Sequence, residues 1–270
     1  KVEPELKEFS QYLKNLHREE AHPIFDFNFD LQSFDFDISQ GLFFDSTIPQ
    51  GYGLGSSGAL CASLFSRYAL NNCDKESFLK DPIMVNRLQS YFSLMESFFH
   101  GSSSGLDPLI SYLNQAMLIR AKNDFERVEI SLSQFGEEKG GIFLLNTGRS
   151  RKTEPLVNLF LEKCLISEFN QACEEELLPI TNDCIKYFCQ KDSSNLLKAF
   201  KSLSSFQREH FGPMIPPLYK GLWEKGLSGD DFYLKLCGAG GGGFLLGITD
   251  DFTKVENVLS NYETRVVCRF

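Results

Sequence analysis

The segment at residues 48–60, IPQGYGLGSSGAL, constrains the fold most, because it places a glycine-rich loop directly before an apolar run. Glycine has no Cβ atom, so the backbone amides of such a loop can approach a ligand closely. Ser56 and Ser57 stand where the N-cap of the following helix belongs. A glycine loop that leads into a helix N-terminus binds anions, and a nucleotide phosphate is the expected occupant. The glycines of this loop are Gly51, Gly53, Gly55 and Gly58.

This loop differs from the two best-known nucleotide-binding patterns. It lacks the Gly-Lys-Ser/Thr of the Walker loop, and it does not follow a strand as the dinucleotide fingerprint requires. A flexible loop before a capped helix is the alternative interpretation, and it accounts for one or two of the glycines rather than for all four.

A second segment, residues 93–109, carries two carboxylates that can converge on one site. Glu96 comes before Asp107 in the chain, and a predicted helix end and a serine-rich turn lie between them. One carboxylate could hold Mg²⁺ through its hard oxygens while the other acts on a substrate hydroxyl. Alternatively, Asp107 is an ordinary N-cap with Pro108 at the first helical position, and the residues alone leave both interpretations open. His100 is expected to end a helix rather than to ligate a metal.

The third segment, residues 235–244 (KLCGAGGGGF), follows a predicted strand and consists largely of glycine. So many glycines weaken a strand, and they suit a place where the main chain lies against a ligand. A wide, flexible turn is the alternative.

Composition limits the class of protein. The chain has 270 residues, enough for one large or two modest domains, and its net charge of −9 argues against a nucleic-acid binder. Its 26 phenylalanines against one tryptophan predict phenylalanine-rich cores. The eight cysteines include no C-x-x-C pair and indicate free thiols in a reducing compartment. No apolar run is long enough to span a membrane and the N-terminus does not resemble a signal peptide, so a soluble cytoplasmic protein is expected.

Hydrophobic periodicity predicts a mixture of helices and strands that do not alternate strictly, which favours the α+β class. Period-two alternation predicts two short strands within residues 25–38. The polar, glycine-rich stretch at 133–141 is the expected domain boundary. Helices are predicted at 4–19, 59–70, 84–99, 155–175, 176–190, 193–210 and 252–262. Further strands are predicted at 141–147, on each side of the glycines at 238–243, and at 264–270.

Together these segments resemble the GHMP kinase superfamily, which includes galactose, homoserine, mevalonate and phosphomevalonate kinases. Residues 49–57 match its ATP-phosphate loop, P-x-x-x-G-L-G-S-S, and residues 237–243 match its C-terminal glycine motif with cysteine in place of threonine or serine. Residues 100–107 resemble the H-G-x-P-S-G-x-D of the mevalonate kinases, with Ser103 in place of proline. Residues 146–153 resemble their N-T-x-x-x-R-x-T.

The resemblance implies a two-domain α+β fold. Residues 1–138 would form an ATP-binding N-terminal domain like ribosomal protein S5, and residues 139–270 a ferredoxin-like C-terminal GHMP kinase domain. The family opens with a strand pair that carries a lysine or arginine and a G-E-H-like motif, and nothing in residues 1–40 matches it. We therefore expect the first strands, with a lysine followed by a Gly-Glu pair, to be encoded upstream of Lys1.

The resemblance also assigns roles. Asp107 falls on the catalytic aspartate that takes or polarises the proton of the substrate hydroxyl, and Glu96 and Ser57 fall on the residues that hold Mg²⁺. The residues expected to bind ATP are Pro49, Gly51, Gly53, Leu54, Gly55, Ser56, Ser57, Gly238, Ala239, Gly240 and Gly241. The candidates for the substrate side are His100, Ser104, Thr147 and Arg149.

The implied activity is transfer of the γ-phosphoryl group of ATP, with Mg²⁺, to a small alcohol, first of all the 5-hydroxyl of mevalonate. The alternatives are another member of the superfamily (a phosphomevalonate or sugar kinase, or diphosphomevalonate decarboxylase) and a non-catalytic nucleotide-binding homologue. The expected partners are ATP and the alcohol, without nucleic acid or membrane, and a monomer or homodimer is expected.

Overall fold

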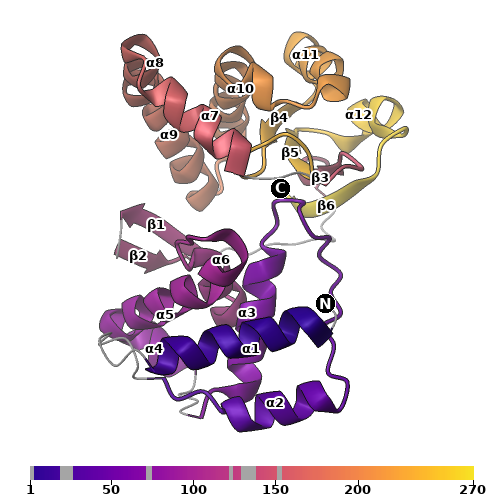
Figure 1. Cartoon of the computed structure of the whole chain (residues 1–270). Coiled ribbons are helices and arrows are strands. Elements are labelled where there is room, and N and C mark those ends of the chain that lie inside the picture. The colour runs from indigo at the N-terminus through magenta and orange to yellow at the C-terminus, as the bar shows by residue number, and fades with distance from the viewer. Residues whose placement is uncertain (1–2, 19–26, 71–74, 122–123, 129–137, 151–153) are drawn as a thin grey trace. The chain divides into compact units, whose positions relative to one another are not determined.

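The chain divides into two compact units in the computed structural model (Figure 1). Unit 1 comprises Lys1–Pro49 and Gly55–Glu129, and unit 2 comprises Gln50–Leu54 and Ile130–Phe270. The predicted boundary between residues 138 and 139 follows a stretch that is outside the described residues, and it stays a prediction. The structure describes residues 3–18, 27–70, 75–121, 124–128, 138–150 and 154–270.

Unit 1 is mainly helical, and its described strands form one antiparallel pair. The predicted helices at 4–19, 59–70 and 84–99 are confirmed with shifted ends. The strands are β1 (Met117–Ala121) and β2 (Asp124–Arg127). The helices are α1 (Glu3–Arg18), α2 (Leu31–Ser39), α3 (Ser56–Tyr68), α4 (Lys75–Lys80), α5 (Pro82–His100) and α6 (Leu106–Leu113).

The second of the strands predicted within residues 25–38 is wrong, because Leu31–Ser39 forms the helix α2. Of the first, residues 27–30 show an isolated antiparallel bridge between Phe29 and Ala69 rather than a full strand. Asp30 caps this helix by accepting a hydrogen bond from the backbone N–H of Ser33. Phe34 and Ile38, four residues apart, are buried together, whereas Phe36 is 63% exposed. The buried residues therefore follow the four-residue spacing of a helix. The period-two pattern includes the same two positions, so it resembled a strand. Residue 25, where the first strand was predicted to begin, is outside the described residues.

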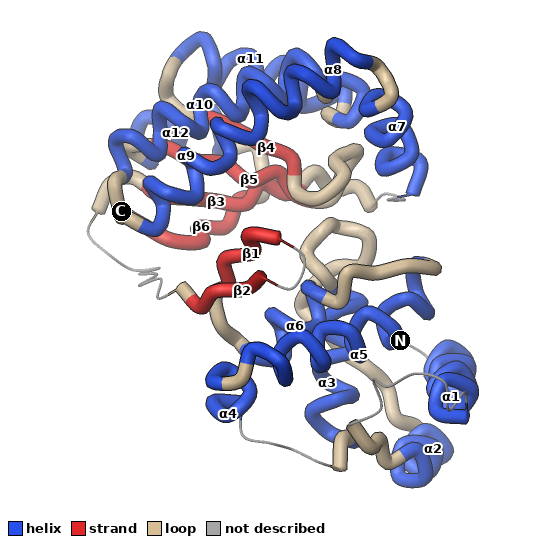
Figure 2. Tube along the Cα trace, turned by 90° about the vertical axis from the view of Figure 1, so that its left-hand side faces the viewer, coloured by secondary structure: helices blue, strands red, loops and turns tan. Residues whose placement is uncertain are grey.

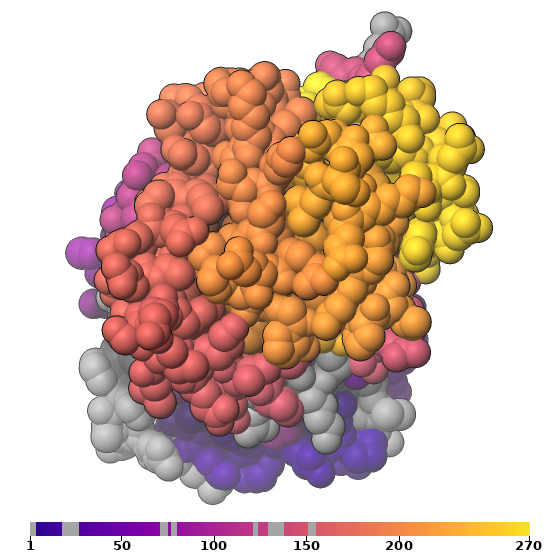
Figure 3. Space-filling view, turned by 90° about the horizontal axis from the view of Figure 1, so that it is seen from above, coloured from indigo at the N-terminus to yellow at the C-terminus, as the bar shows by residue number. Residues whose placement is uncertain are grey.

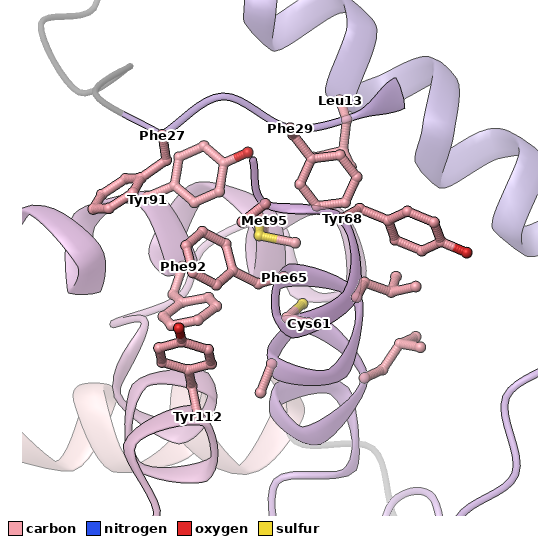
Figure 4. Close-up of a cluster of buried hydrophobic side chains, with 14 of the residues drawn as sticks. Leu13, Phe27, Phe29, Cys61, Phe65, Tyr68, Tyr91, Phe92, Met95 and Tyr112 are labelled. Carbon is pink, nitrogen blue, oxygen red and sulfur yellow. The ribbon is translucent and has the colours of Figure 1, made fainter. Parts of the chain in front are cut away.

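The core of unit 1 is built from aromatic rings, as the composition predicts (Figure 4). Phe65 of α3 is its centre, with ring centroids of Phe92 and Tyr112 each 5.1 Å away and that of Phe27 at 5.5 Å. These contacts join α3 to α5 and α6, and each ring is buried. Edge-to-face aromatic packing of this kind holds the three helices in a defined arrangement.

Unit 2 contains an antiparallel sheet with the strand order β4-β5-β3-β6 (Figure 2). Along the chain the order is strand, helices, two strands, helix, strand, which is the ferredoxin-like topology. The predicted ferredoxin-like C-terminal domain and the α+β class are therefore confirmed. The strands are β3 (Gly141–Asn146), β4 (Tyr233–Leu236), β5 (Phe244–Thr249) and β6 (Thr264–Arg269).

Helices of unit 2 pack on this sheet, and their residues make up much of the surface seen in Figure 3. Most were predicted, but α11 was missed, and the helix predicted at 155–175 is divided. A five-residue π-helical turn, Cys173–Leu177, joins α8 to α9. The helices are α7 (Glu154–Cys164), α8 (Ser167–Ala172), α9 (Leu178–Cys189), α10 (Ser193–His210), α11 (Lys220–Gly229) and α12 (Phe252–Leu259).

The core of unit 2 is continuous with its sheet. Phe143 of β3 is fully buried and lies in one cluster with Trp223 of α11 and Val255 of α12. The neighbouring residue Ile142 lies in a second cluster with Phe200 of α10. Successive residues of β3 therefore enter different clusters, as strand geometry requires. Within the described part of the chain, no helix has the length and apolar character needed to cross a membrane.

Candidate active site

The helix α3 begins immediately after the glycine-rich loop. Gly55 is its N-cap in the left-handed conformation, with φ 70°, and provides no side-chain hydrogen bond. Ser56 and Ser57 are the first two helical residues, so the prediction that they precede the helix as an N-cap is wrong. Their place in the first turn brings the Ser57 hydroxyl to the positive end of the helix dipole.

Asp107 is the second residue of α6, and Gly105 is the N-cap of that helix. The interpretation of Asp107 as an N-cap is therefore wrong, and Pro108 occupies the third helical position rather than the first. The N-cap residue Gly105 provides no side-chain hydrogen bond, but the Ser104 hydroxyl accepts one from the N–H of Leu106 at 3.4 Å. The first turn of α6 thus carries the Asp107 carboxylate without using it as the cap.

The first turns of α3 and α6 touch. A Cβ atom built on Gly58 would lie 2.7 Å from both the Cβ atom of Asp107 and the backbone nitrogen of Pro108. A Cβ atom on Gly55 would lie 3.1 Å from Oδ2 of Asp107. The absence of side chains at these two glycines therefore brings the main chain of the phosphate-loop motif against the Asp107 carboxylate.

The last turns of α5 place Glu96 and His100 beside Ser57. The Ser57 hydroxyl donates a hydrogen bond to Oε1 of Glu96 at 2.8 Å, and its oxygen lies 2.9 Å from Nε2 of His100. A hydroxyl has one hydrogen, so Nε2 of His100 is the donor in the second bond. His100 also ends α5, as predicted, with Gly101 following it in a positive-φ conformation.

The electrostatics distinguish the two carboxylates. Glu96 is buried, with 4% of its surface exposed, and accepts hydrogen bonds from hydroxyl groups. Asp107 keeps an exposed face, but the protein atoms packed around its carboxyl group raise its pKa above the usual value by desolvation. The negative charge of Glu96 raises this pKa further, and His100 opposes the rise. Perturbed carboxylates of this kind are typical of catalytic sites.

The second glycine segment and the N-T-x-x-x-R-x-T segment meet within unit 2. Thr147 is buried, and its backbone N–H and hydroxyl donate to the carbonyl of Gly243 at 2.8 and 2.7 Å. The N–H of Gly243 in turn donates to the carbonyl of Arg149. The Thr147 hydroxyl therefore holds the glycine loop in this structure, and the assignment of Thr147 and Arg149 to the substrate stays a prediction.

Tyr52, from the first glycine loop, also packs in unit 2. Its carbonyl accepts a hydrogen bond from the N–H of Phe244 at 3.2 Å, and the two rings are 5.5 Å apart. A Cβ atom on Gly243 would lie 2.2 Å from the Tyr52 oxygen, which only glycine avoids.

The predicted nucleotide-binding residues belong to both units. Those of unit 1 are Pro49, Gly55, Ser56 and Ser57, and those of unit 2 are Gly51, Gly53, Leu54, Gly238, Ala239, Gly240 and Gly241.

Comparison with known proteins agrees with these motifs. Residues 12–115 match the family model for the GHMP kinases N terminal domain. Residues 12–115 are therefore similar to that domain. Mevalonate kinase of Dictyostelium discoideum is 25% identical over 242 residues, and the match covers 80% of this chain. It covers 59% of the length of that relative. The predicted resemblance to the GHMP kinases, and among them to mevalonate kinase, is confirmed.

A solved structure, the mevalonate kinase of methicillin-resistant Staphylococcus aureus, is also similar. Its TM-score is 0.46 and its sequence identity 17%, with 82% of this chain and 68% of that chain covered.

Unit 1 has oxygen donors that fit Mg²⁺. The carboxylate of Glu96 and the hydroxyl of Ser57 are adjacent, and both are hard ligands. Mg²⁺ in kinases is commonly held by one or two protein groups together with substrate phosphates. Among the described residues, no three His, Cys, Asp or Glu side chains are grouped to hold a metal without such phosphates.

Sequence reasoning missed the turn that joins Glu96 to the helix of Asp107. Ser103 donates to Oε2 of Glu96, and its carbonyl accepts a hydrogen bond from Ser93 at 2.5 Å. The carbonyl of Ser104, a predicted substrate residue, accepts from the side chain of Gln89. The feature that could have indicated this turn is the serine run at 102–104, which has a hydroxyl where the resembled motif has proline.

Proposed function

We propose that this protein is an ATP-dependent kinase that transfers a phosphoryl group to the hydroxyl of a small alcohol, with mevalonate as the acceptor. The observation that carries the proposal is that Ser57 and Asp107 lie in the adjoining first turns of α3 and α6, with Glu96 of α5 bonded to Ser57. This arrangement joins phosphate-binding backbone, candidate metal ligands and a carboxylate with a raised pKa in one place.

In the proposed reaction, Asp107 orients the acceptor hydroxyl and accepts its proton as the hydroxyl oxygen attacks the γ-phosphorus of ATP and ADP leaves. Its raised pKa makes it a stronger base than an ordinary aspartate. The N–H groups in the first turn of α3 would stabilise the charge on the phosphate oxygens. Catalysis then depends mainly on positioning and on charge, as in other phosphoryl transfers.

Glu96 and Ser57 would hold Mg²⁺ against the nucleotide phosphates. The bound ion would neutralise negative charge on the phosphoryl oxygens. His100 donates its Nε2 hydrogen to Ser57, which keeps the hydroxyl hydrogen directed to Glu96. One lone pair of the Ser57 oxygen then stays available for a ligand.

Mevalonate is the proposed acceptor because two features of the sequence favour it. The segments at 100–107 and 146–153 resemble mevalonate kinase motifs, and the relative from Dictyostelium discoideum is named mevalonate kinase. The proposal includes a cytoplasmic location, which the cysteine pattern predicts, and ATP and the alcohol as the partners. The roles of the loop residues at 49–57 and 238–241 toward ATP are part of the same proposal.

An ADP-release assay of the full gene product tests this function. The acceptors are mevalonate, phosphomevalonate, homoserine and galactose, each at saturating MgATP. We expect mevalonate to give the fastest turnover. Faster turnover of another alcohol would overturn the acceptor and leave the kinase assignment, whereas ATP binding without ADP release on any acceptor would support a non-catalytic homologue.

A further inference from the structure

We infer that Ser103 is a positioning residue that orients the Glu96 carboxylate for Mg²⁺ and couples it to the helix that carries Asp107. This inference rests on the proposed metal-binding role of Glu96. The Ser103 hydroxyl donates to Oε2 of Glu96, while Ser57 donates to Oε1, so both carboxylate oxygens accept a hydroxyl hydrogen. A buried carboxylate bonded at both oxygens has a defined orientation.

The hydroxyl of Ser103 makes two hydrogen bonds. It accepts a hydrogen bond from the backbone N–H of Gly105 at 3.0 Å and gives its single hydrogen to Glu96. Gly105 is the N-cap of α6, two residues before Asp107. One hydroxyl therefore connects the proposed metal ligand to the start of the helix that carries the proposed base.

The turn that carries Ser103 is fixed against α5. The Ser103 carbonyl accepts from the Ser93 hydroxyl at 2.5 Å, and a Cβ atom on Gly105 would lie 2.5 Å from the backbone nitrogen of Ser93. The main chain thus has little freedom at this point, and the Ser103 side chain is held facing Glu96. A proline at position 103, as in the resembled motif, could donate no hydrogen bond to the carboxylate.

The test measures divalent-metal binding rather than turnover. Mn²⁺ serves as the probe, and its free concentration is read from its electron paramagnetic resonance signal in the presence of the full gene product and ADP. Ser103→Ala should raise the half-saturating Mn²⁺ concentration about tenfold, the effect of losing one hydrogen bond to a charged group. Ser103→Thr keeps the hydroxyl and should restore binding to within about twofold of wild type.

Matched variants distinguish a loss of Glu96 positioning from a general distortion of the loop. Ser102→Ala removes the exposed neighbouring hydroxyl and should leave Mn²⁺ binding unchanged. ADP affinity in excess chelator should be the same in wild type and Ser103→Ala, whereas a distorted loop would lower it. If Ser103→Ala unfolds, Ser103→Cys keeps the volume, donates only weakly and should show the same weakened Mn²⁺ binding.

Two results overturn the inference in different ways. Unchanged Mn²⁺ binding in Ser103→Ala, with binding weakened in Glu96→Gln, removes the role of Ser103 and leaves the proposed metal ligand. Unchanged binding in Glu96→Gln removes the metal-binding role of Glu96 in the proposed function, and the inference about Ser103 with it.

Discussion

Gly58 and Asp107 lie so close that a Cβ atom on the glycine would be 2.7 Å from the Cβ atom of the aspartate. The first turns of α3 and α6 can therefore approach each other only with glycine at position 58. The same approach sets the Asp107 carboxylate beside Gly55, the residue that precedes α3. The geometry of the proposed site thus depends on a residue that performs no chemistry.

Gly58→Ala should separate the two turns. The obstructing atoms include backbone, which cannot move aside easily, so we expect a loss of about 1–3 kcal/mol in the free energy of unfolding. Turnover should fall as well, because Asp107 is displaced. Urea denaturation and an ADP-release assay measure the two effects.

Gly221→Ala is the matched control for that variant. Gly221 is in the helix α11, and a Cβ atom there meets nothing within 4 Å. Alanine should stabilise this helix by about 0.4–1 kcal/mol. Equal stability changes in the two variants would contradict the close contact between α3 and α6.

Asp107→Asn should raise the melting temperature. The folded pKa of Asp107 lies above its unfolded value, so the ionised group costs stability above the unfolded pKa. This cost disappears as the pH falls through the folded pKa. Asparagine removes the desolvated charge and its repulsion from Glu96, so we expect stabilisation at pH 7 that shrinks in acid. Calorimetry at pH 7 and pH 4 measures it, and a destabilised variant at pH 7 would show that the carboxylate supports the fold.

Glu96→Gln should weaken the response to magnesium. Glutamine keeps the shape but not the charge, so the Mg²⁺ concentration for half-maximal turnover should rise by about tenfold or more. The measurement is a Mg²⁺ titration at fixed ATP. The same half-saturation in both proteins would exclude Glu96 as a ligand.

Asp37→Asn should destabilise unit 1 in a pH-dependent way. Arg67 and Tyr68 donate to Oδ2 of Asp37 at 2.7 and 2.8 Å, and these hydrogen bonds lower the pKa of its carboxyl. A lowered folded pKa adds stability above the unfolded value of 3.8 and loses it as the pH falls through the folded pKa. Urea denaturation at pH 7 should therefore show a less stable variant, and at pH 2.5 a smaller difference.

An exposed aspartate provides the comparison. Asp45→Asn removes the same charge from the loop that precedes the glycine segment. A similar pH-dependent loss in this variant would attribute the effect to net charge instead of to the contacts of Asp37.

Long periodic segments could be predicted from the sequence, because their burial repeats over many residues. Helices such as α5 and α10 are of this kind. The helix α2 is too short for that argument. Its buried Phe34 and Ile38 satisfy both a period of two and a spacing of four, and the cap at Asp30 decides between them.

The motifs likewise identified Ser57, Glu96 and Asp107, and the structure places them at adjoining helix turns. The role of Ser103 could not be predicted, because its hydrogen bond to Glu96 depends on how the turn packs against α5. The N-cap of α6 could not be assigned from the sequence either. Gly105 fits tightly against the backbone of α5, which is tertiary packing that an Asp-Pro pattern does not reveal.

The most direct test of the central claim is a single-turnover measurement by phosphorus nuclear magnetic resonance on the full gene product. Enzyme in excess of MgATP is mixed with mevalonate, and wild type is compared with Asp107→Asn. The account predicts that wild type converts ATP to ADP and a phosphate monoester in equal amounts. It predicts that Asp107→Asn binds ATP equally well and reacts about 10²-fold or more slowly. Equal rates in the two proteins, or loss of ATP without a phosphorylated alcohol, would contradict it.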